Sequence, residues 1–400
     1  WRTGRGHPPS ARTSIGGPTS GRNTTARTGR RTVATSKTDT YVIPFGPAHP
    51  GSGNFRIWLT VDGERVIKAR AEPGFLHRGF EKLMEYRTLL QNAVLADRIC
   101  ILEPLSWDLV FAMAAERLQG IEVPERAKYI RVLLAELTRI QSHLIWFGVA
   151  GIAMGFDTVF KVALTWREEI LRLFEEVTGA RVYPTGYIRP GGVRWDLPEG
   201  FLERAEEVLL HMEHYIFELN DLFFENPSFV SRTKGLAVLP SEKGIELGAS
   251  GPALRASGIP YDVRRDDPYL VYDRLEFRLV SREEGDALSR FLVGRDEVLE
   301  SVRIGLQVIR DMPAGEYQVK VGPFVKVKEG EAYAHIEAAR GDAGCYMVGT
   351  GGHTPYRVKL RGPSFTLLIP VLEYLLRGVE IADVPVVFWS LNHCPADMDR

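Results

Sequence analysis

A long apolar stripe after Pro124 constrains the fold of this 400-residue chain more than any other feature. The stripe recurs at i, i+3, i+4 and i+7 spacing, the pattern of a helix with one broad buried face. Its members are Ile130, Leu133, Leu134, Leu137, Ile140, Leu144 and Phe147. Proline suits the first turn of such a helix. Further helices are predicted at 167–179, 199–226, 284–312 and 365–377, so a helical bundle forms the centre of the predicted fold.

Strand patterns flank this bundle. Phe55, Ile57, Leu59 and Val61 alternate with other residues up to an Asp-Gly turn, and residues 64–72 return, which predicts an N-terminal hairpin. Short strands are predicted at 316–321, 331–338, 345–350 and 356–360, and a buried strand at 384–391. The predicted fold class is α+β, with a central helical bundle, an N-terminal β-hairpin and a small C-terminal β-sheet.

Residues 1–40 differ from the rest of the chain. They are rich in Arg, Gly, Thr and Ser and nearly lack large apolar side chains. Such a segment buries too little surface to offset its ordering entropy. It is predicted to be a disordered basic tail, and residues 41–400 are predicted to form one domain.

Composition excludes several classes of protein. A net charge of −1 argues against nucleic acid as a partner, because such proteins carry a clustered basic excess. Three cysteines are too few for a disulfide framework. No apolar run reaches the roughly 18 residues that span a bilayer, so any link to a membrane is expected through partner subunits.

Two of the three cysteines share a local pattern. Cys100 in "DRICILEPLSWD" and Cys394 in "SLNHCPADMDR" are each followed three residues later by a carboxylate, Glu103 and Asp397. A lone cysteine is often a small buried apolar residue, and Cys345, within a predicted strand, is interpreted in that way. The repeated pattern predicts instead that Cys100 and Cys394 meet at one site.

From Ile43 to Arg400 the chain resembles two related families. The matching motifs include "GPAHPG", "GFLHRGFEKLMEYRTLLQN", "VPERAKYIRVLLAELTRIQSHL", "YIRPGGV", "LRASGIPYDVR", "PYLVYDRLEF", "TPYRVKLRGPSF" and the terminal "DMDR". They resemble the D subunit of NADH-quinone oxidoreductase (complex I) and the large subunit of membrane-bound nickel–iron hydrogenases. The resemblance implies a fold like that of the hydrogenase large subunit.

The hydrogenase resemblance implies that the two cysteines are remnants of metal-ligand pairs. Hydrogenases of this kind hold nickel and iron with two Cys-x-x-Cys pairs, and soft thiolates suit these metals. Cys100 and Cys394 match the first cysteine of each pair, whereas Glu103 and Asp397 replace the second. Carboxylates are hard ligands, so a nickel–iron centre is not expected and no metal is assigned to this chain.

The complex I resemblance implies a quinone in the same pocket, but several polar groups of that family are replaced. His49 is kept, whereas a second histidine is Gly53 and the tyrosine that bonds the quinone is Ile101. A histidine beside the terminal iron–sulfur cluster falls near Tyr183-Pro184. A quinone carbonyl needs donors within reach, and Ile101 offers none.

The resemblance also assigns roles to charged residues. Glu81, in "LHRGFE" with His77 and Arg78, matches a motif at which hydrogenases pass protons, so it is a candidate proton relay. Arg98 and Arg78 are expected near the iron–sulfur cluster of a partner subunit. Asp399 and Arg400 match a closing Asp-Arg pair, expected to be buried and to anchor the terminus. His143 is expected to be a hydrogen-bonded core residue.

The resemblance therefore implies a catalytic electron-transfer subunit of a membrane-associated oxidoreductase like complex I. Electrons are expected from a 4Fe-4S cluster in a B-like iron–sulfur small subunit and are expected to pass to quinone. A C-like subunit and membrane-arm subunits are further expected partners. The chain is expected to bind no cofactor alone and to lie on the cytoplasmic side of the cell membrane.

Two alternatives stay open. In the first, Cys100 and Cys394 reduce sulfane sulfur such as polysulfide, because one thiolate attacks an S–S bond and the second thiol resolves the mixed disulfide. In the second, the chain is a hydrogenase-like scaffold without a reaction of its own.

Overall fold

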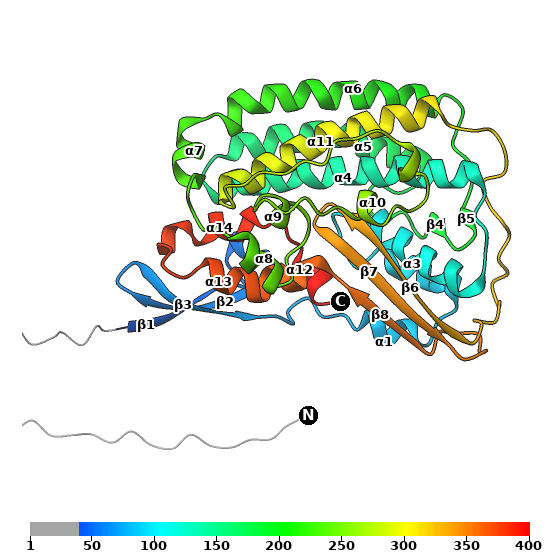
Figure 1. Cartoon of the computed structure of the whole chain (residues 1–400), viewed down its shortest axis with the longest axis horizontal. Helices are drawn as coiled ribbons and strands as arrows, with labels where there is room; N and C mark the ends of the chain where they lie inside the picture. Colours follow the sequence, from blue (N-terminus) through cyan, green and yellow to red (C-terminus); the bar gives the residue numbers. More distant parts are fainter. Residues whose placement is uncertain (1–39) are drawn as a thin grey trace, which may run out of the picture. The chain divides into compact units, whose positions relative to one another are not determined.

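Four long helices lie side by side in the computed structural model, which describes residues 40–400 (Figure 1). They are α4 Glu125–Ala153, α5 Asp157–Thr178, α6 Phe201–Leu219 and α11 Ala287–Arg310. α4 packs against α5 and α11, and α6 packs against the same two helices. Every residue of the predicted apolar stripe is buried in α4, so this helix and its buried face are confirmed.

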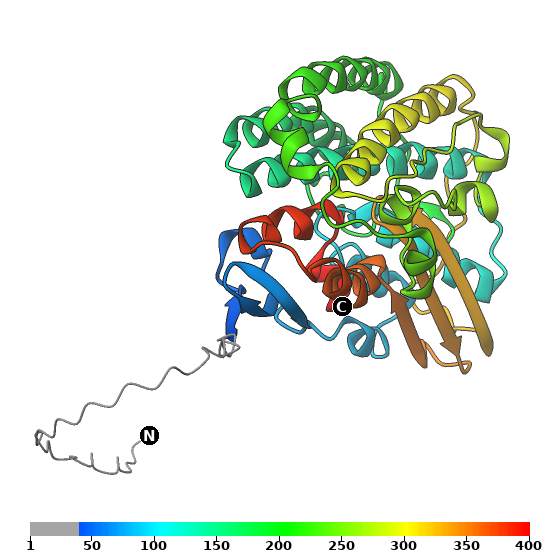
Figure 2. The same ribbon diagram turned by 60° about the vertical axis from the view of Figure 1, so that its left-hand side comes forward.

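Two antiparallel sheets lie on the side of the bundle away from α6 (Figures 1 and 2). The N-terminal sheet has the order β1-β2-β3, and the C-terminal sheet has the order β6-β7-β8. The bounds are β1 Thr40–Phe45, β2 Arg56–Asp62, β3 Arg65–Glu72, β6 Gly330–Ala338, β7 Gly341–Gly349 and β8 Arg357–Arg361. The predicted hairpin is β2 and β3, to which β1 adds a third strand. The α+β fold class is thus confirmed.

Shorter elements connect these layers. Helix α3, Pro104–Gln119, packs against β6, β7 and α4 and is buried almost all round. The others before β6 are η1 Pro50–Ser52, α1 Phe80–Met84, α2 Leu89–Ala96, β4 Ile188–Arg189, β5 Gly192–Val193, η2 Asn220–Phe224, α7 Pro227–Thr233, α8 Ser241–Glu246, α9 Gly251–Arg255, α10 Val263–Asp266 and η3 Tyr272–Arg274. The predicted helix at 199–226 is α6 followed by the π-turn η2.

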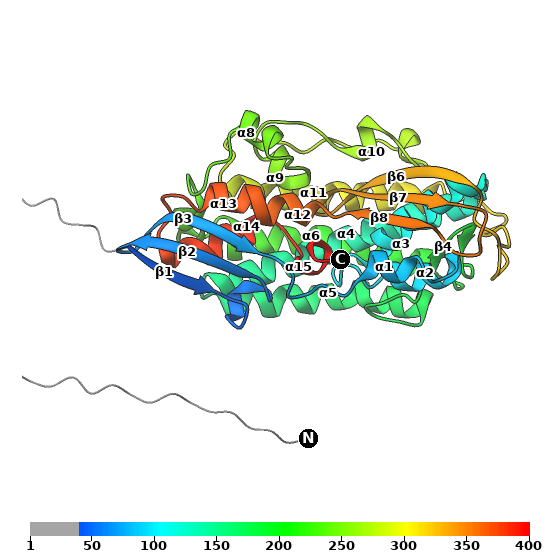
Figure 3. The ribbon, with the colours of Figure 1, turned by 90° about the horizontal axis from the view of Figure 1, so that it is seen from below.

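After β8, the regular elements of the C-terminal segment are all short helices. It contains α12 Pro363–Thr366, η4 Leu367–Val371, α13 Leu372–Leu375, η5 Ile381–Asp383, α14 Val384–Ser390 and α15 Pro395–Met398. Seen from below, α15 lies between the N-terminal sheet and α1 (Figure 3). The end of the chain is therefore placed against segments that are more than 300 residues away in sequence.

Two strand predictions are wrong. Residues 384–391 form helix α14, which packs against α4 and α11. A short apolar run does not distinguish a buried strand from a buried helix, and Pro385 suits a first helical turn. Residues 316–321 make only an isolated bridge, between Gln318 and Gly192, because no adjacent strand continues the pairing.

The predicted tail lies outside the described residues, apart from Thr40. Within the described part of the chain, none of the helices is long and apolar enough to cross a membrane.

Candidate active site

Cys100 and Cys394 lie in two different loops that bring their side chains together. Cys100 lies in the loop between α2 and α3, and Cys394 is the N-cap residue of α15. The two sulfur atoms and a carboxylate oxygen of Asp397 all lie within 4.8 Å of one another. The predicted convergence of the two cysteines is therefore confirmed. Cys345 lies apart, buried in β7, as predicted.

Arg78 connects the two cysteine loops. Its Nη1 donates to the carbonyl of Arg98 at 2.7 Å, and its Nη2 donates to the carbonyl of Ile99 at 3.1 Å. The same Nη2 lies 3.3 Å from the carbonyl of Ala396, in the other loop. One guanidinium thus fixes the position of one loop relative to the other. The position of Arg78 relative to a partner's cluster remains a prediction.

Arg340 brings a buried positive charge to the thiol pair. This residue lies in the turn between β6 and β7 and is fully buried. Its Nη1 lies 2.6 Å from Oε2 of Glu103 and donates to Oγ of Ser142 at 3.0 Å. Glu103 also accepts a hydrogen bond from the backbone N–H of Ala339. The carboxylate that follows Cys100 therefore orients Arg340, whereas the one that follows Cys394 faces the sulfur atoms.

The two thiols differ in acidity. The thiol of Cys100 donates toward the sulfur of Cys394, and this is the largest effect on the pKa of Cys394. Burial opposes it, but the charge of Arg340 and the backbone N–H groups of Asp397 and Ala396 act in the same direction as Cys100, so the pKa of Cys394 is lowered to about 6. Burial raises the pKa of Cys100 well above its ordinary value. The pair therefore shares one proton near neutral pH, with the negative charge mainly on Cys394.

Asp397 is a neutral acid in this setting. Burial raises its pKa well above the usual range, and the nearby Cys394 adds to the shift. Its Oδ2 accepts a hydrogen bond from Oγ of Ser364 at 2.9 Å, and the same hydroxyl accepts one from the backbone N–H of Cys394 at 2.9 Å. No group of the described residues donates to its Oδ1.

Gly362 leaves the space that the Cys394 turn occupies. A Cβ atom at this position would lie 2.6 Å from the carbonyl oxygen of Asp397 and 2.8 Å from its Oδ1. Both distances are too short for a real contact, and one partner is backbone. The turn must therefore move if residue 362 carries a side chain.

We expect Gly362→Ala to separate the two sulfur atoms. A displacement of 1 Å in reacting groups can slow a reaction about 10²-fold, so mild oxidation should form the Cys100–Cys394 disulfide at least 10-fold more slowly than in the wild type. Mass spectrometry of the cross-linked peptide measures this rate. Gly322→Ala is the matched control, because its Cβ would meet no atom within 4 Å. An unchanged rate in Gly362→Ala would show that the turn does not depend on this glycine.

Two of the predicted quinone-side residues, Gly53 and Ile101, lie beside residues of the cysteine loops. Gly53 adopts a left-handed conformation, with a φ of 56°, and faces the Trp389 ring and Pro395, next to Cys394. His49 caps η1 by accepting from the N–H of Gly51 at 3.0 Å. Ile101 is 46% exposed beside the fully buried Cys100. Both thiols are thus covered by neighbouring residues, although Ile101 next to Cys100 reaches the surface.

Glu81 is held as an anion. Burial raises its pKa, but hydrogen bonds from Lys359 and from the N–H of Leu360 outweigh this effect and lower the pKa below its ordinary value. Its Oε2 also lies 2.9 Å from Nη2 of Arg357. Together with His77, Asp399 and other residues, Glu81 lines a cavity of about 300 Å³. These contacts favour a structural carboxylate, and its role as a proton relay remains a prediction.

The terminal Asp399 and Arg400 anchor the chain separately. Asp399 accepts hydrogen bonds from the N–H groups of Gly74 and Leu76 at 2.8 and 2.9 Å. Arg400 donates to the carbonyl of Leu360 at 2.7 Å. The prediction that these two side chains pair with each other is wrong, because backbone groups on either side offer each of them its own partner.

Arg98 lies at the surface of the same region. Its Nη1 donates to the carbonyl of Val94 at 2.6 Å and pairs with Asp97, and its guanidinium lies over the Tyr183 ring at 5.3 Å. Burial raises the pKa of Asp97 to about 6, against the charge of Arg98. The side chain of Arg98 is 36% exposed, so it is accessible to another protein. Its contact with a partner's cluster stays a prediction.

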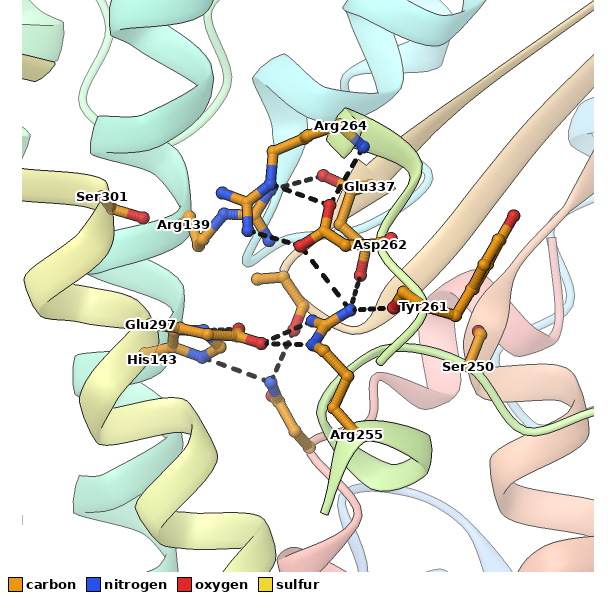
Figure 4. Close-up of polar contacts among 12 residues, drawn as sticks. Arg139, His143, Ser250, Arg255, Tyr261, Asp262, Arg264, Glu297, Ser301 and Glu337 are labelled. Atoms are coloured by element: carbon orange, nitrogen blue, oxygen red, sulfur yellow. Dashed lines mark hydrogen bonds and ion pairs between the residues drawn. The ribbon is translucent and has the colours of Figure 1, made fainter. Parts of the chain in front are cut away.

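A second polar cluster lies deeper, between the bundle and the C-terminal sheet (Figure 4). We call it the buried ion network. Three guanidinium groups and four carboxylates form it, with His143 attached: Arg139, Arg255, Arg264, Glu136, Asp262, Glu297 and Glu337. All are buried. Burial raises the pKa of Glu337 to about 7; the charge of Arg255 opposes this shift and the charge of Asp262 adds to it.

The buried ion network also fixes the loop that leads into Cys394. Asn392 donates to the carbonyl of Ala339 at 2.9 Å and lies 3.3 Å from Nδ1 of His143. His143 in turn contacts Glu297 through Nε2 at 3.0 Å (Figure 4). His143 is therefore a hydrogen-bonded core histidine, as predicted, and it connects the network to the active-site loop.

Sequence reasoning missed Arg340, Ser364 and His393. Arg340 lies in "EAARGDAG", a stretch that is typical of an exposed turn, and it is buried by tertiary contacts that include Glu103 and Ser142 of α4. His393 precedes Cys394 and stacks on Trp389 with ring centroids 4.9 Å apart. Burial lowers its pKa to about 3, so this histidine stays neutral.

The comparisons with known proteins agree on one family. The family described as respiratory-chain NADH dehydrogenase, 49 kDa subunit, matches residues 153–325 and 320–400. The D subunit of NADH-quinone oxidoreductase from Desulforamulus reducens is 42% identical over 366 residues, which are 91% of this chain and 100% of the relative. The D subunit of F(420)H(2) dehydrogenase from Methanosarcina mazei is 41% identical, over 90% of this chain and 97% of the relative.

One chain of a solved structure is about as similar to this chain as these relatives are. It is the membrane-bound sulfane sulfur reductase, an archaeal respiratory membrane complex, in which the matching chain is 43% identical. The match has a TM-score of 0.87 and covers 91% of this chain and 100% of the other. The relatives thus differ in the substrates for which they are named, although their chains are about equally similar to this one.

Proposed function

Because the chain belongs to the family of the respiratory-chain NADH dehydrogenase 49 kDa subunit, we propose that it is the catalytic subunit of a membrane-bound oxidoreductase and that its thiol pair reduces sulfane sulfur. One observation carries this choice of substrate. The sulfur atoms of Cys100 and Cys394 are buried within 4.8 Å of each other, the charge of Arg340 acts on both, and only one of the two thiols is ionised near neutral pH. A thiolate nucleophile next to a resolving thiol is the arrangement that thiol–disulfide exchange needs.

The reaction balances as a two-electron reduction. The Cys394 thiolate attacks one sulfur of the substrate, so that a Cys394–sulfur bond forms, the substrate S–S bond breaks and the first sulfide leaves. Cys100 then gives its proton to the first sulfide and attacks the Cys394 sulfur, which releases the second sulfide and leaves a Cys100–Cys394 disulfide. Two electrons return the disulfide to the thiol and thiolate. Counted with the protons on the products, the reaction consumes one S–S bond, two electrons and two protons.

The electrons come from outside this chain. A cubane iron–sulfur cluster usually takes four thiolates, and the chain has three cysteines, of which Cys345 lies apart in a sheet. We assign the cluster to an iron–sulfur partner that docks near Arg98 and Arg78, with membrane-arm subunits holding the complex at the cytoplasmic face of the membrane. The relatives are named as subunits and the solved structure as a membrane-bound respiratory complex, which supports a membrane-bound assembly of several subunits.

Quinone is the second candidate acceptor. The names of several relatives favour it, and His49 is kept as the cap of η1. Against it, Ile101 and Gly53 offer no side-chain donor to a quinone carbonyl. Quinone reduction in this chain would therefore depend on His49 and on the space around Gly53.

An assay of the purified complex decides between these acceptors. Reduced ferredoxin or NADH serves as the electron donor, and polysulfide and quinone are offered in turn. We expect hydrosulfide to form from polysulfide at a rate well above that of quinone reduction. Rapid quinone reduction without release of hydrosulfide would establish the second candidate, and no reaction with any acceptor would favour a scaffold.

A further inference from the structure

We propose that Arg340 selects anionic sulfur substrates by donating hydrogen bonds from Nε and Nη2 to the terminal sulfur of a polysulfide. This inference rests on the proposed sulfane-sulfur reaction and deepens it, because it names the charge class of the substrate. Polysulfide ions belong to this class, whereas dialkyl trisulfides are neutral.

In the part of the chain that the structure describes, the guanidinium of Arg340 has one edge with hydrogen-bond partners and one edge without them. On one side, Nη1 reaches Glu103 at 2.6 Å and Ser142 at 3.0 Å. On the other side, no group of the described residues accepts from Nε or from Nη2. Buried polar groups are almost always paired in native proteins, and an unpaired donor is costly. Two unused donors on one fully buried guanidinium indicate an acceptor that the chain itself does not supply.

The neighbours of Arg340 indicate where this acceptor belongs. The charge of Arg340 acts on both cysteine sulfurs and on Asp397, and it lowers the pKa of each of these groups. Its own pKa is raised because these groups and Glu103 outweigh the effect of burial. The contacts agree with this placement: Glu103, three residues after Cys100, lies 2.6 Å from Arg340, and Asn392, two residues before Cys394, donates to the carbonyl of the adjacent Ala339 at 2.9 Å. We therefore infer that the free donors face the thiol pair.

The reaction explains why an anion needs this residue. A polysulfide carries negative charge on its terminal sulfur, and it must approach a pocket that already holds one thiolate. A guanidinium whose geometry is fixed by Glu103 and Ser142 offsets the charge of this terminal sulfur without rearranging.

Lysine cannot replace both functions of Arg340. A guanidinium presents donors on two edges, so it can bind Glu103 with one and a substrate with the other. A lysine has a single nitrogen, which would pair with the buried Glu103 carboxylate. Arg340→Lys therefore keeps the charge and the ion pair but removes the donors that face the substrate.

The test compares two substrates on the assembled complex. Inorganic polysulfide is the anionic probe and dimethyl trisulfide the neutral one. We expect Arg340→Lys to lower kcat/KM for polysulfide by about 10²-fold, mainly through KM, because charge-assisted hydrogen bonds of this kind are strong. For dimethyl trisulfide the change should stay below about 3-fold. Ser142→Ala is the matched control: it removes a contact on the Nη1 side, so it should affect both substrates equally.

Each result has one interpretation. An equal loss for both substrates in Arg340→Lys would overturn the inference and leave Arg340 as a residue that activates the thiols. A wild-type complex that reduces neither sulfur substrate would reject the proposed function itself, and the inference with it. If the Arg340→Lys complex does not assemble, a measurement on the wild-type complex tests the inference instead. Added hydrosulfide should then inhibit dimethyl trisulfide reduction competitively, and the absence of such inhibition would also overturn the inference.

Discussion

Replacing Cys394 by serine should abolish sulfane-sulfur reduction while the complex still assembles. Cys394 carries the thiolate, because Cys100, Arg340 and two backbone N–H groups lower its pKa to about 6. Serine is similar in size but is a far weaker nucleophile at neutral pH. We expect turnover with polysulfide to fall on the order of 10³-fold or more, as happens when an enzyme loses its nucleophile. Steady-state release of hydrosulfide measures the effect.

In the Cys100→Ser variant, the reaction should stop after the first attack. The Cys394 thiolate can still attack, but no thiol remains to resolve the product. We therefore expect one equivalent of sulfide per site in a burst, followed by arrest, with added sulfur on the Cys394 peptide in mass spectrometry. Cys345→Ala is the matched control, because this cysteine is buried in β7 away from the site. Full quinone reduction in the Cys100→Ser, Cys394→Ser double variant would contradict the thiol mechanism.

Removing Arg255 from the buried ion network should destabilise the protein by about 3–5 kcal/mol, the usual cost of leaving buried carboxylates without their partner. Arg255 is fully buried and donates to Glu297 at 2.9 Å and to Glu337 at 2.7 Å, and it also lies 3.7 Å from Asp262 (Figure 4). Methionine would fill similar volume but leave these carboxylates facing one another. We expect the unfolding temperature of the complex to fall by at least about 5 °C for Arg255→Met.

Two further variants test the cause of this effect. Arg310→Met removes an exposed pair with Asp311, so its unfolding temperature should match that of the wild type. Adding Glu297→Gln to Arg255→Met should restore part of the loss, because it removes one of the unpaired charges. A loss in Arg255→Met that is no larger than in Arg310→Met would show that the network does not stabilise the fold.

The local pattern of the sequence was sufficient for the long helices and for the pairing of the cysteines. The stripe of α4 repeats over five turns, so its period identifies the helix without any knowledge of its neighbours. Gly179 ends α5 as predicted, in the left-handed conformation that glycine adopts readily. The Cys-x-x-acid pattern at two distant positions correctly indicated a common site.

Where a sequence pattern is short, the tertiary structure decided whether the segment forms a helix or a strand. Residues 384–391 fit a strand or a helix equally well, and their packing against α4 and α11 made them α14. The two carboxylates of the cysteine pattern have the same spacing, yet Glu103 turns to Arg340 whereas Asp397 faces the sulfur atoms. Spacing along the chain does not determine which way a loop side chain turns.

The sequence alone thus determined the α+β architecture, the family and the presence of two thiols at one site. Only the tertiary structure placed the charge of Arg340 beside them and made one thiol more acidic than the other. The physical reason is that helical periodicity is a local property of the chain. Burial and electrostatic shifts depend on segments hundreds of residues apart, here the loop of Cys100, the end of β6 and the turn of Cys394.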